Sequence, residues 1–177
     1  MTEAGSCMPL PSNLAIRPAE PSDVPLLVQF IRELAEAERF PYPVTVSEAD
    51  LRESLFGPRP AAEARLGFAD GQAAAFAVFY ETFSTTTGRR GLHLDDLFVR
   101  PAFQGRGFGT AMLQHVAAVA KQRGCRRFEW WALKWNEQAL GFYASVGARR
   151  LEEIVVHRTE GEALDRLAGP ERRSGPL

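Results

Sequence analysis

The stretch from Leu92 to Thr110, LHLDDLFVRPAFQGRGFGT, constrains the fold of this chain more than any other. It begins as an apolar strand, passes a proline, becomes a glycine-rich turn and opens into the long helical pattern AMLQHVAAVAKQR. A helix N-terminus carries partial positive charge and unsatisfied N–H donors, and glycines remove the side chains that would keep an anion away. The stretch therefore predicts a phosphate-binding turn between a central strand and a helix.

Composition and length favour one globular domain. Of the 177 residues, 45% are hydrophobic and 24% are charged, which is typical of a soluble domain with a sizeable core. We expect a flexible leader over residues 1–13, a single domain over 14–168 and a disordered tail over 169–177. The net charge of −1 gives no global basic field, so the chain is not expected to bind nucleic acid.

Targeting and redox signals point to the cytoplasm. The N-terminus MTEAGSCMPLPSN lacks the basic and apolar regions of a signal peptide, and no window approaches the ~20 apolar residues of a membrane span. The two cysteines, Cys7 and Cys125, are expected to be reduced thiols rather than a disulfide framework. We therefore expect a cytoplasmic protein with no membrane partner.

The residues before the central stretch predict a strand, two helices and a hairpin. The strand is expected over 14–17, the first helix is expected to be capped by Ser22, and the second by Ser47. Two apolar runs flank the dipeptide Asp70-Gly71, which is a strong hairpin signal, so residues 64–83 are expected to form an antiparallel pair.

The residues after the long helix predict a strand over 127–133, a short helix capped by Asn136 and passing through Tyr143, and a last strand over 150–157. Such alternation indicates an α/β or α+β fold with helices on both faces of a central sheet. No ligand spacing for a metal is found.

Two motifs carry a resemblance to a known family. The sequence QGRGFG, Gln104 to Gly109, resembles the Gln/Arg-x-x-Gly-x-Gly/Ala pattern of the GNAT N-acetyltransferase superfamily. The stretch WNEQALGFYASVGA, Trp135 to Ala148, is similar to that family's Asn-x-x-Ala-x-x-Phe-Tyr-x-x-x-Gly segment. Two motifs in the right order are far more specific than one glycine pattern. The resemblance implies a GNAT-type mixed, mostly antiparallel central sheet.

Within that superfamily the chain most resembles the diamine (spermidine/spermine) acetyltransferases and their thialysine-acetylating relatives. The resemblance lies in AIRPAEPSDV, IRELAEAE, EADL, LDDLFV and WNEQALGFY. It implies acetyl transfer from acetyl-CoA, with no metal, to a primary amine of a small molecule: a diamine, a polyamine or an amino-acid-like amine. It also implies direct transfer in a ternary complex by a homodimer.

The acetyl-CoA site is expected along the central stretch. The backbone of the turn would hold the pyrophosphate, and Asn136 either caps its helix, binds the cofactor arm or does both. Either Arg100 or Arg106 could meet the ribose phosphate, although a solvent-facing position is the plainer expectation for each. The resemblance adds that the pantetheine arm pairs with the strand backbone and that Tyr143 lies beside it. The expected cofactor-binding residues are Leu97, Phe98, Val99, Gln104, Gly105, Arg106, Gly107, Phe108, Gly109, Thr110, Asn136 and Tyr143.

Aminolysis of a thioester needs a neutral amine, a polarised carbonyl and a proton for the departing thiolate. The adjacent carboxylates Asp95 and Asp96 are candidates for deprotonating the amine, although alternation along a strand turns only one toward the substrate unless a bulge re-aims the pair. The resemblance implies that Asp95 is the base, acting through water. His93 is a rival because imidazole titrates in the right range.

Tyr143 matches the family's general acid. A phenol has a pKa near ~10, so it stays protonated at neutral pH and can donate to the departing sulfur. The alternative is that Tyr143 only packs into the core from a short helix and has no catalytic role.

The acceptor is expected to contact Glu38, Asp95 and Asp96. The polyamine-acetylating relatives carry acidic residues in the loop after the first helix, where this chain has Pro41-Tyr42. Less charge at the mouth favours a smaller amine than spermine. Two alternatives remain: acetylation of a protein or peptide amine, and a non-catalytic acetyl-CoA-binding module.

Overall fold

The computed structural model describes residue 11 and residues 13–169. The expected leader over 1–13 and tail over 169–177 therefore lie almost wholly outside the described residues, as does Cys7. The chain divides into two compact units, Met1–Phe142 and Tyr143–Leu177. In chain order the elements are β1 (Leu14–Pro18), η1 (Pro21–Asp23), α1 (Val24–Glu38), α2 (Glu48–Phe56), β2 (Glu63–Ala69), β3 (Gln72–Ser84), β4 (Arg89–Val99), η2 (Pro101–Phe103), α3 (Phe108–Gln122), β5 (Arg127–Trp130), α4 (Glu137–Ser145) and α5 (Glu162–Ala168).

The first unit is built on a five-stranded sheet with the order β1-β2-β3-β4-β5. The pairings from β1 to β4 are antiparallel, and β4 pairs with β5 in parallel. The predicted hairpin turn is confirmed, because Asp70 and Gly71 both have positive φ, 51° and 78°. Positive φ at both central residues matches the right-handed twist of the flanking strands.

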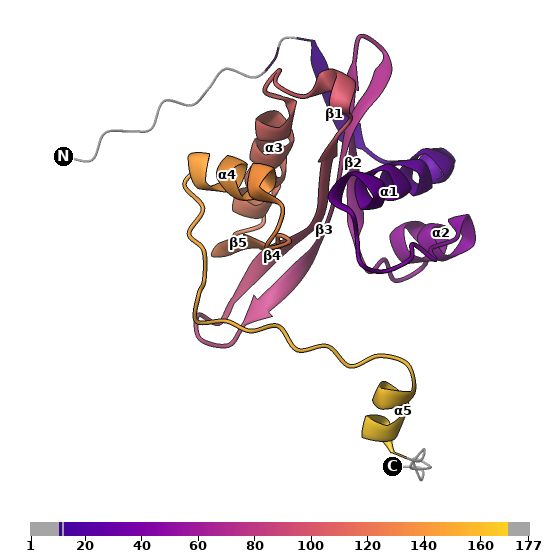
Figure 1. Cartoon of the computed structure of the whole chain (residues 1–177), viewed down its shortest axis with the longest axis vertical. Helices are drawn as coiled ribbons and strands as arrows, with labels where there is room; N and C mark the ends of the chain where they lie inside the picture. Colours follow the sequence, from indigo (N-terminus) through magenta and orange to yellow (C-terminus); the bar gives the residue numbers. More distant parts are fainter. Residues whose placement is uncertain (1–10, 12, 170–177) are drawn as a thin grey trace, which may run out of the picture. The chain divides into compact units, whose positions relative to one another are not determined.

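Helices cover both faces of this sheet, which confirms the expected fold class. One apolar cluster packs α1 and α2 against Leu66, Phe76 and Phe98, so we call this side the α1 face. A second cluster packs α3 against Phe79 and Leu92 on the opposite side. Figure 1 shows α1 and α2 on one side of the strands and α3 on the other. Alternating side chains of β3 and β4 therefore feed two separate cores.

Helix caps agree with the sequence at one end and differ at another. The amide N–H of Asp50 donates to the Ser47 hydroxyl at 3.2 Å, and the Asp50 carboxylate accepts from the Ser47 N–H at 3.0 Å, so the predicted cap of α2 is confirmed. Ser22 does not cap α1, and that prediction is wrong. Glu20 and Asp23 instead form a reciprocal capping box around the short η1 turn, which displaces the start of α1 to Val24.

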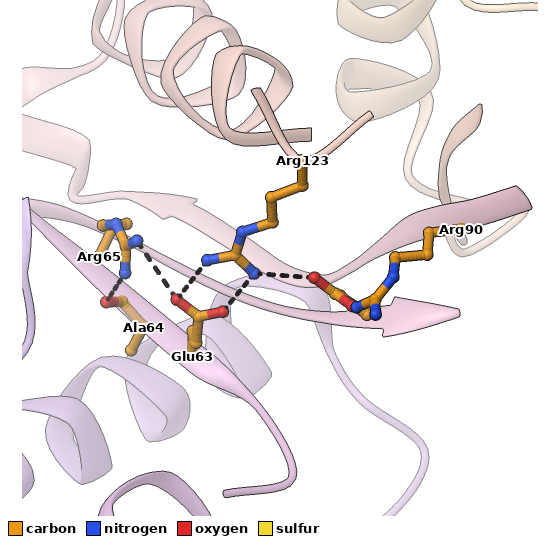
Figure 2. Close-up of polar contacts among 6 residues, drawn as sticks. Glu63, Ala64, Arg65, Arg90 and Arg123 are labelled. Atoms are coloured by element: carbon orange, nitrogen blue, oxygen red, sulfur yellow. Dashed lines mark hydrogen bonds and ion pairs between the residues drawn. The ribbon is translucent and has the colours of Figure 1, made fainter. Parts of the chain in front are cut away.

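An arginine after α3 ties this helix to the strands below it. Arg123 donates two hydrogen bonds to Glu63 on β2, at 2.5 and 2.9 Å, and one to Glu81 on β3 at 3.4 Å. Arg65 also reaches Glu63, and Arg90 pairs with Glu81 (Figure 2). The paired arginines hold the pKa of Glu63 below its usual value. The network anchors one end of α3, far along β4 from the glycine-rich turn.

Two strand predictions near the C-terminus are wrong in extent or in kind. The strand expected over 127–133 ends at Trp130, where its pairing with β4 ends. The strand expected over 150–157 does not form within the described part of the chain, and its apolar residues Ile154, Val155 and Val156 are more than half exposed. Alternation makes a segment compatible with a strand, but a strand also needs a hydrogen-bonded neighbour, which the pattern does not supply.

Candidate active site

A β-bulge lies at the acidic pair on the central strand. In the β3–β4 ladder Phe79 pairs with Leu94 and Val78 pairs with Asp96, so Asp95 is an extra residue with no partner of its own on β3. A bulge shifts the alternation of side chains by one residue. Because of this shift, the neighbouring carboxylates Asp95 and Asp96 can lie on the same face of the sheet and serve one site.

The bulge brings the acidic pair to the α1 face. Before it, Leu92 and Leu94 pack against α3; after it, Leu97 does so. Asp96 lies opposite Val78, whose side chain belongs to the α1 cluster, and it is partly buried. Asp95 is exposed beside it. One carboxylate is thus held at the edge of the core while the other meets solvent.

The parallel strands β4 and β5 separate at the position of the bulge. The β4–β5 pairing ends at Leu94 and Trp130, whereas β4 remains paired with β3 as far as Val99. From Asp95 onward, one edge of β4 therefore extends beyond its pairing with β5. Such a strand edge offers N–H and C=O groups to an extended ligand. The expected pairing residues Leu97, Phe98 and Val99 lie on this segment.

Three carboxylates influence one another on the α1 face. Burial, together with the charges of Asp95 and Glu38, raises the pKa of Asp96 to about 7. Burial likewise raises the pKa of Glu38, at the C-terminal end of α1. Neighbouring carboxylates repel one another when all of them are ionised, so a cation that binds between them lowers this repulsion. The site expected for an ammonium, Glu38 with Asp95 and Asp96, is thus brought together.

The end of α1 is fastened to the segment that follows β5. Asn136 donates from Nδ2 to Oε1 of Glu38 at 3.0 Å, and Trp135 donates from its indole to the Glu38 carbonyl at 3.3 Å. The Oδ1 of Asn136 accepts from the N–H of Ala139 at 3.0 Å, which confirms it as the cap of α4. The side chain of Asn136 is engaged at both ends.

The glycine-rich turn has the backbone geometry of an anion cradle. Gly105 and Gly107 have positive φ, 73° and 78°, and Gly107 is the N-cap of α3. The first intrahelical N–H is that of Ala111, which donates to the Gly107 carbonyl, so the N–H groups of the first turn of α3 have no intrahelical acceptor. At Gly105 an added Cβ would meet no atom within 4 Å, so the turn is open on that side. The turn therefore has the open backbone and the free N–H groups that a phosphate group needs.

The side chains around the cradle differ in their availability. Gln104 donates its side-chain amide to the Val99 carbonyl at 2.9 Å, so it braces the turn against the strand and leaves its backbone for a ligand. Arg106 is exposed, with its guanidinium 5.6 Å from the Phe103 ring, and it remains a candidate for a phosphate. Phe108 is buried in the core, whereas Gly109 and Thr110 are partly buried.

Arg100 is not the solvent-facing residue that the sequence suggests. It forms a two-pronged ion pair with Glu33 of α1 at 2.8 and 2.9 Å, donates to the Ala73 carbonyl at 2.9 Å and lies 4.4 Å from the Phe30 ring. Its donors are committed to holding α1 on the sheet, so Arg106 is the better candidate for the ribose phosphate.

Tyr143 is the first residue of the second unit and is partly buried. It lies in the last turn of α4, and its backbone carbonyl accepts from the N–H of Ala148 at 3.1 Å. Gly147, with a φ of 81°, ends this helix as the sequence predicts.

Aromatic residues beside the acidic pair were missed as a group by the sequence analysis. His93, the rival base, is 5% exposed and packs between Tyr80, with ring centroids 5.1 Å apart, and Trp131, at 4.8 Å. Burial lowers the pKa of His93, so it is a neutral imidazole near pH 7. The pairing of Tyr80 with His93 across β3 and β4 could have indicated this group, but it can be seen only once the register of the two strands is known.

A hollow of about 640 Å³ lies elsewhere, at the end of β3 and the start of β4. Glu81, Arg90 and Arg123 line it together with Phe83 and Arg89. Because the ion pairs shown in Figure 2 already satisfy Arg90 and Arg123, this hollow is formed by structural charges and lies away from the bulge.

Two further observations concern the described part of the chain. No helix in it is long and apolar enough to cross a membrane. It holds no group of three or more histidine, cysteine, aspartate or glutamate side chains placed to bind a metal ion.

Comparison with known proteins agrees with this geometry. Residues 29–148 match the acetyltransferase (GNAT) family. A thialysine N-epsilon-acetyltransferase from Mus musculus is 37% identical over 169 residues, which cover 89% of this chain and 99% of that protein. The Homo sapiens spermidine/spermine N(1)-acetyltransferase-like protein 1 is 31% identical over 140 residues, 75% of this chain and 20% of the larger protein.

Among solved structures, an integron cassette protein from the mobile metagenome of V. cholerae superposes with a TM-score of 0.72 and 25% identity, covering 89% of this chain and 99% of that one. Both the family match and the relatives extend over the bulge and the glycine-rich turn. The chain therefore belongs to the acetyltransferase (GNAT) family and is an enzyme that moves an acetyl group from acetyl-CoA to an amine of a small molecule.

Proposed function

We propose that the acceptor is a small primary amine, a diamine, polyamine or amino-acid-like amine, bound as its ammonium on the α1 face and acetylated directly in a ternary complex. The observation that carries this proposal is the bulge at Asp95, which gathers Asp95, Asp96 and Glu38 where β4 parts from β5. A cluster of carboxylates binds an ammonium and lowers its own mutual repulsion. The open edge of β4 beside the cluster suits the extended arm of the acetyl donor.

The acetyl donor would be held by backbone groups. The N–H groups at the start of α3, with Arg106 and the hydroxyl of Thr110, would bind its phosphates, and Leu97 to Val99 would pair with its pantetheine arm. Bound acetyl-CoA supplies a thioester carbonyl as the electrophile. The resemblance to the diamine and thialysine acetyltransferases supports these roles.

Proton movement follows from the charges at the bulge. Asp95, the exposed carboxylate, takes a proton from the ammonium through water, while Asp96 and Glu38 orient the amine. The neutral nitrogen then bonds to the carbonyl carbon, the carbon–sulfur bond breaks, and the Tyr143 hydroxyl gives its proton to the departing sulfur. The nitrogen loses its second proton as the amide forms, and this proton restores the Tyr143 hydroxyl, so that the free thiol and the neutral amide are the products. Asp96, with its pKa raised to about 7, is the second candidate for the base because its protonation is poised near neutral pH.

We also propose that residues 14–168 act as one catalytic domain, that the protein works as a homodimer in the cytoplasm, and that it takes neither nucleic acid nor membrane as a partner. The match over 29–148 supports the domain, and the resemblance supports the dimer. The net charge of −1 supports the absence of a polyanion partner.

The test is an acceptor panel assayed with the full chain and acetyl-CoA. Release of the CoA thiol is followed with a thiol reagent, and the acetylated product is identified by mass. Thialysine, ornithine, spermidine and short alkylamines are compared with lysine-bearing and N-terminal peptides. Turnover of free amines with a low KM is expected; turnover of peptides alone would overturn the proposal and favour the protein N-acetyltransferase alternative.

A further inference from the structure

Three aromatic rings form a continuous row beside the acidic pair. Tyr80 on β3 is the cross-strand partner of His93 on β4, and their ring centroids lie 5.1 Å apart. Trp131 follows the end of β5 and meets the other side of His93, with centroids 4.8 Å apart and ring planes at 67°. Because Tyr80 follows Phe76 and Val78 by alternation, the row lies on the α1 face.

Burial differs sharply along this row. His93 is 5% exposed, whereas Trp131 is 59% exposed. The edge-to-face contact holds the indole in place, yet most of its apolar surface still faces solvent. An exposed, positioned tryptophan beside a binding site is a ready-made contact surface for a ligand.

The row also adjoins the carboxylates. Asp95 follows His93 by two residues on β4, and His93 pairs with Tyr80 across the ladder. The charge of Asp95 also acts on the pKa of both rings. Burial raises the pKa of Tyr80 and lowers that of His93, so the phenol and the imidazole are both uncharged at neutral pH. An uncharged aromatic surface thus lies directly next to the anionic cluster.

We propose that Trp131, seated on His93, forms the distal wall of the acceptor pocket and selects primary amines whose carbon chain ends in a flat ring, that is, arylalkylamines. This inference rests on the proposed acetyl transfer to a small primary amine, and it replaces the diamine, polyamine or amino-acid-like acceptor with one whose non-reacting end is a flat ring. The ammonium would lie among Glu38, Asp95 and Asp96, and the ring would lie on the indole.

The distal end of the acceptor could be a second ammonium or an aromatic ring, and the strength of its attraction to the indole favours the ring. A cation over an exposed aromatic face strengthens binding by about two- to fivefold. A phenyl ring that covers roughly 100 Å² of apolar surface strengthens binding by well over tenfold. The loop after α1, with its exposed Pro41 and Tyr42, adds no further carboxylate to hold a distant ammonium.

The test compares acceptors that differ only at the distal end. Steady-state kinetics are measured with 2-phenylethylamine, n-butylamine and 1,4-diaminobutane for the wild type and for Trp131→Ala. The wild type is expected to have a kcat/KM roughly 10-fold higher for 2-phenylethylamine than for 1,4-diaminobutane, a difference of 1.4 kcal/mol. Trp131→Ala is expected to erase this preference through KM, with the diamine value unchanged within about twofold.

Phe83→Ala is the control, because Phe83 is 64% exposed near the far end of β3. This substitution should leave kcat/KM unchanged for every acceptor. An equal loss for all three amines in Trp131→Ala, or no preference in the wild type, overturns the inference while acetylation itself stands. Absence of turnover with any amine instead overturns the proposed function. Calorimetric titration of 2-phenylethylamine into the CoA-bound protein then measures the contribution of Trp131 to acceptor binding. Weaker binding to Trp131→Ala than to the wild type supports the inference, and equal binding rejects it.

Discussion

The Nδ2 amide of Asn136 donates a 3.0 Å hydrogen bond to Oε1 of Glu38, which joins the last residue of α1 to the residue that caps α4. Oδ1 of the same side chain accepts from the N–H of Ala139, so Asn136 has both ends in use. Glu38 therefore has two separable properties, a hydrogen bond that holds the segment after β5 and a charge that raises the pKa of Asp96.

A pair of substitutions at Glu38 separates these properties. Glu38→Gln keeps an acceptor for Asn136 and removes the charge, so KM for the amine should rise roughly 10-fold, equivalent to 1.4 kcal/mol, with little change in Tm. Glu38→Ala also removes the hydrogen bond and should lower the unfolding free energy by about 1 kcal/mol more. Kinetics and thermal melts of both variants provide the measurement. Identical behaviour of the two variants would show that the charge has no role of its own.

The buried carboxyl of Asp96 predicts a pH-dependent stability. Its pKa is raised from 3.8 to about 7, so the unfolded chain loses this proton near pH 4 while the folded protein keeps it to about 7. The folded state binds more protons across that window, and the contribution of Asp96 to the unfolding free energy falls as the pH rises. Asp96→Asn, which does not titrate, should gain more Tm relative to the wild type at about pH 8 than at about pH 5, by about 2–4 °C for each kcal/mol.

Asp95→Asn is the matched control for this melt, because Asp95 is the exposed neighbour on the same bulge. A Tm difference between Asp96→Asn and the wild type that is the same at both pH values would contradict the raised pKa. The pH–rate profiles of the two variants also separate the candidates for the base, since only loss of the true base should remove the rise in kcat/KM with pH.

Local signals in the sequence predicted the elements of the first unit well. The Asp70-Gly71 turn, the Ser47 cap and the glycines before α3 each act over a few residues, so their physical causes are visible in the chain itself. The acidic pair lies on the central strand, as its apolar neighbours in the sequence predict. The side on which the carboxylates lie was not fixed, because a bulge depends on how β3 and β4 register.

Longer-range contacts account for what the sequence could not predict. Arg100 resembles a surface arginine until its partner Glu33, 67 residues earlier, is known. Trp131 is one of three tryptophans close together in sequence, and its contact with the ring of His93 is visible only in the folded chain. The segment 150–157 has the alternation of a strand but no neighbour in the described sheet.

The cradle predicts a selective loss of acetyl-CoA affinity in Gly107→Ala. Gly107 has a φ of 78°, which a Cβ disfavours by roughly 1 kcal/mol, so the turn should shift away from the geometry that presents its N–H groups. We expect the Kd for acetyl-CoA to rise roughly 10-fold with little change in amine KM. Gly88→Ala is the control, with a φ of 62° and open space around its Cβ position in the β3–β4 loop. If both variants bind acetyl-CoA as the wild type does, the cradle is misplaced.

The charge network beside α3 should matter for stability alone. Arg123→Ala removes three hydrogen bonds to Glu63 and Glu81, and a partly exposed network of this kind contributes about 1 kcal/mol, or about 2–4 °C in Tm. Arg126→Ala changes an exposed arginine nearby and should leave Tm unchanged. Thermal melts at low and high salt measure the effect, which should shrink with salt. A fall in kcat with a normal Tm would instead mean that the network reaches the active site.

Tyr143 offers the sharpest test of the proposed chemistry. Tyr143→Phe keeps the ring in α4 and removes only the hydroxyl, so the departing sulfur would lose its proton donor. Because a positioned general acid contributes roughly 100-fold or more, kcat should fall by about that factor while the Kd for acetyl-CoA stays within about twofold. Tyr42→Phe, at an exposed tyrosine after α1, is the control and should keep the wild-type kcat. An unaltered kcat in Tyr143→Phe would remove this residue from the acid role and leave protonation of the thiolate to solvent.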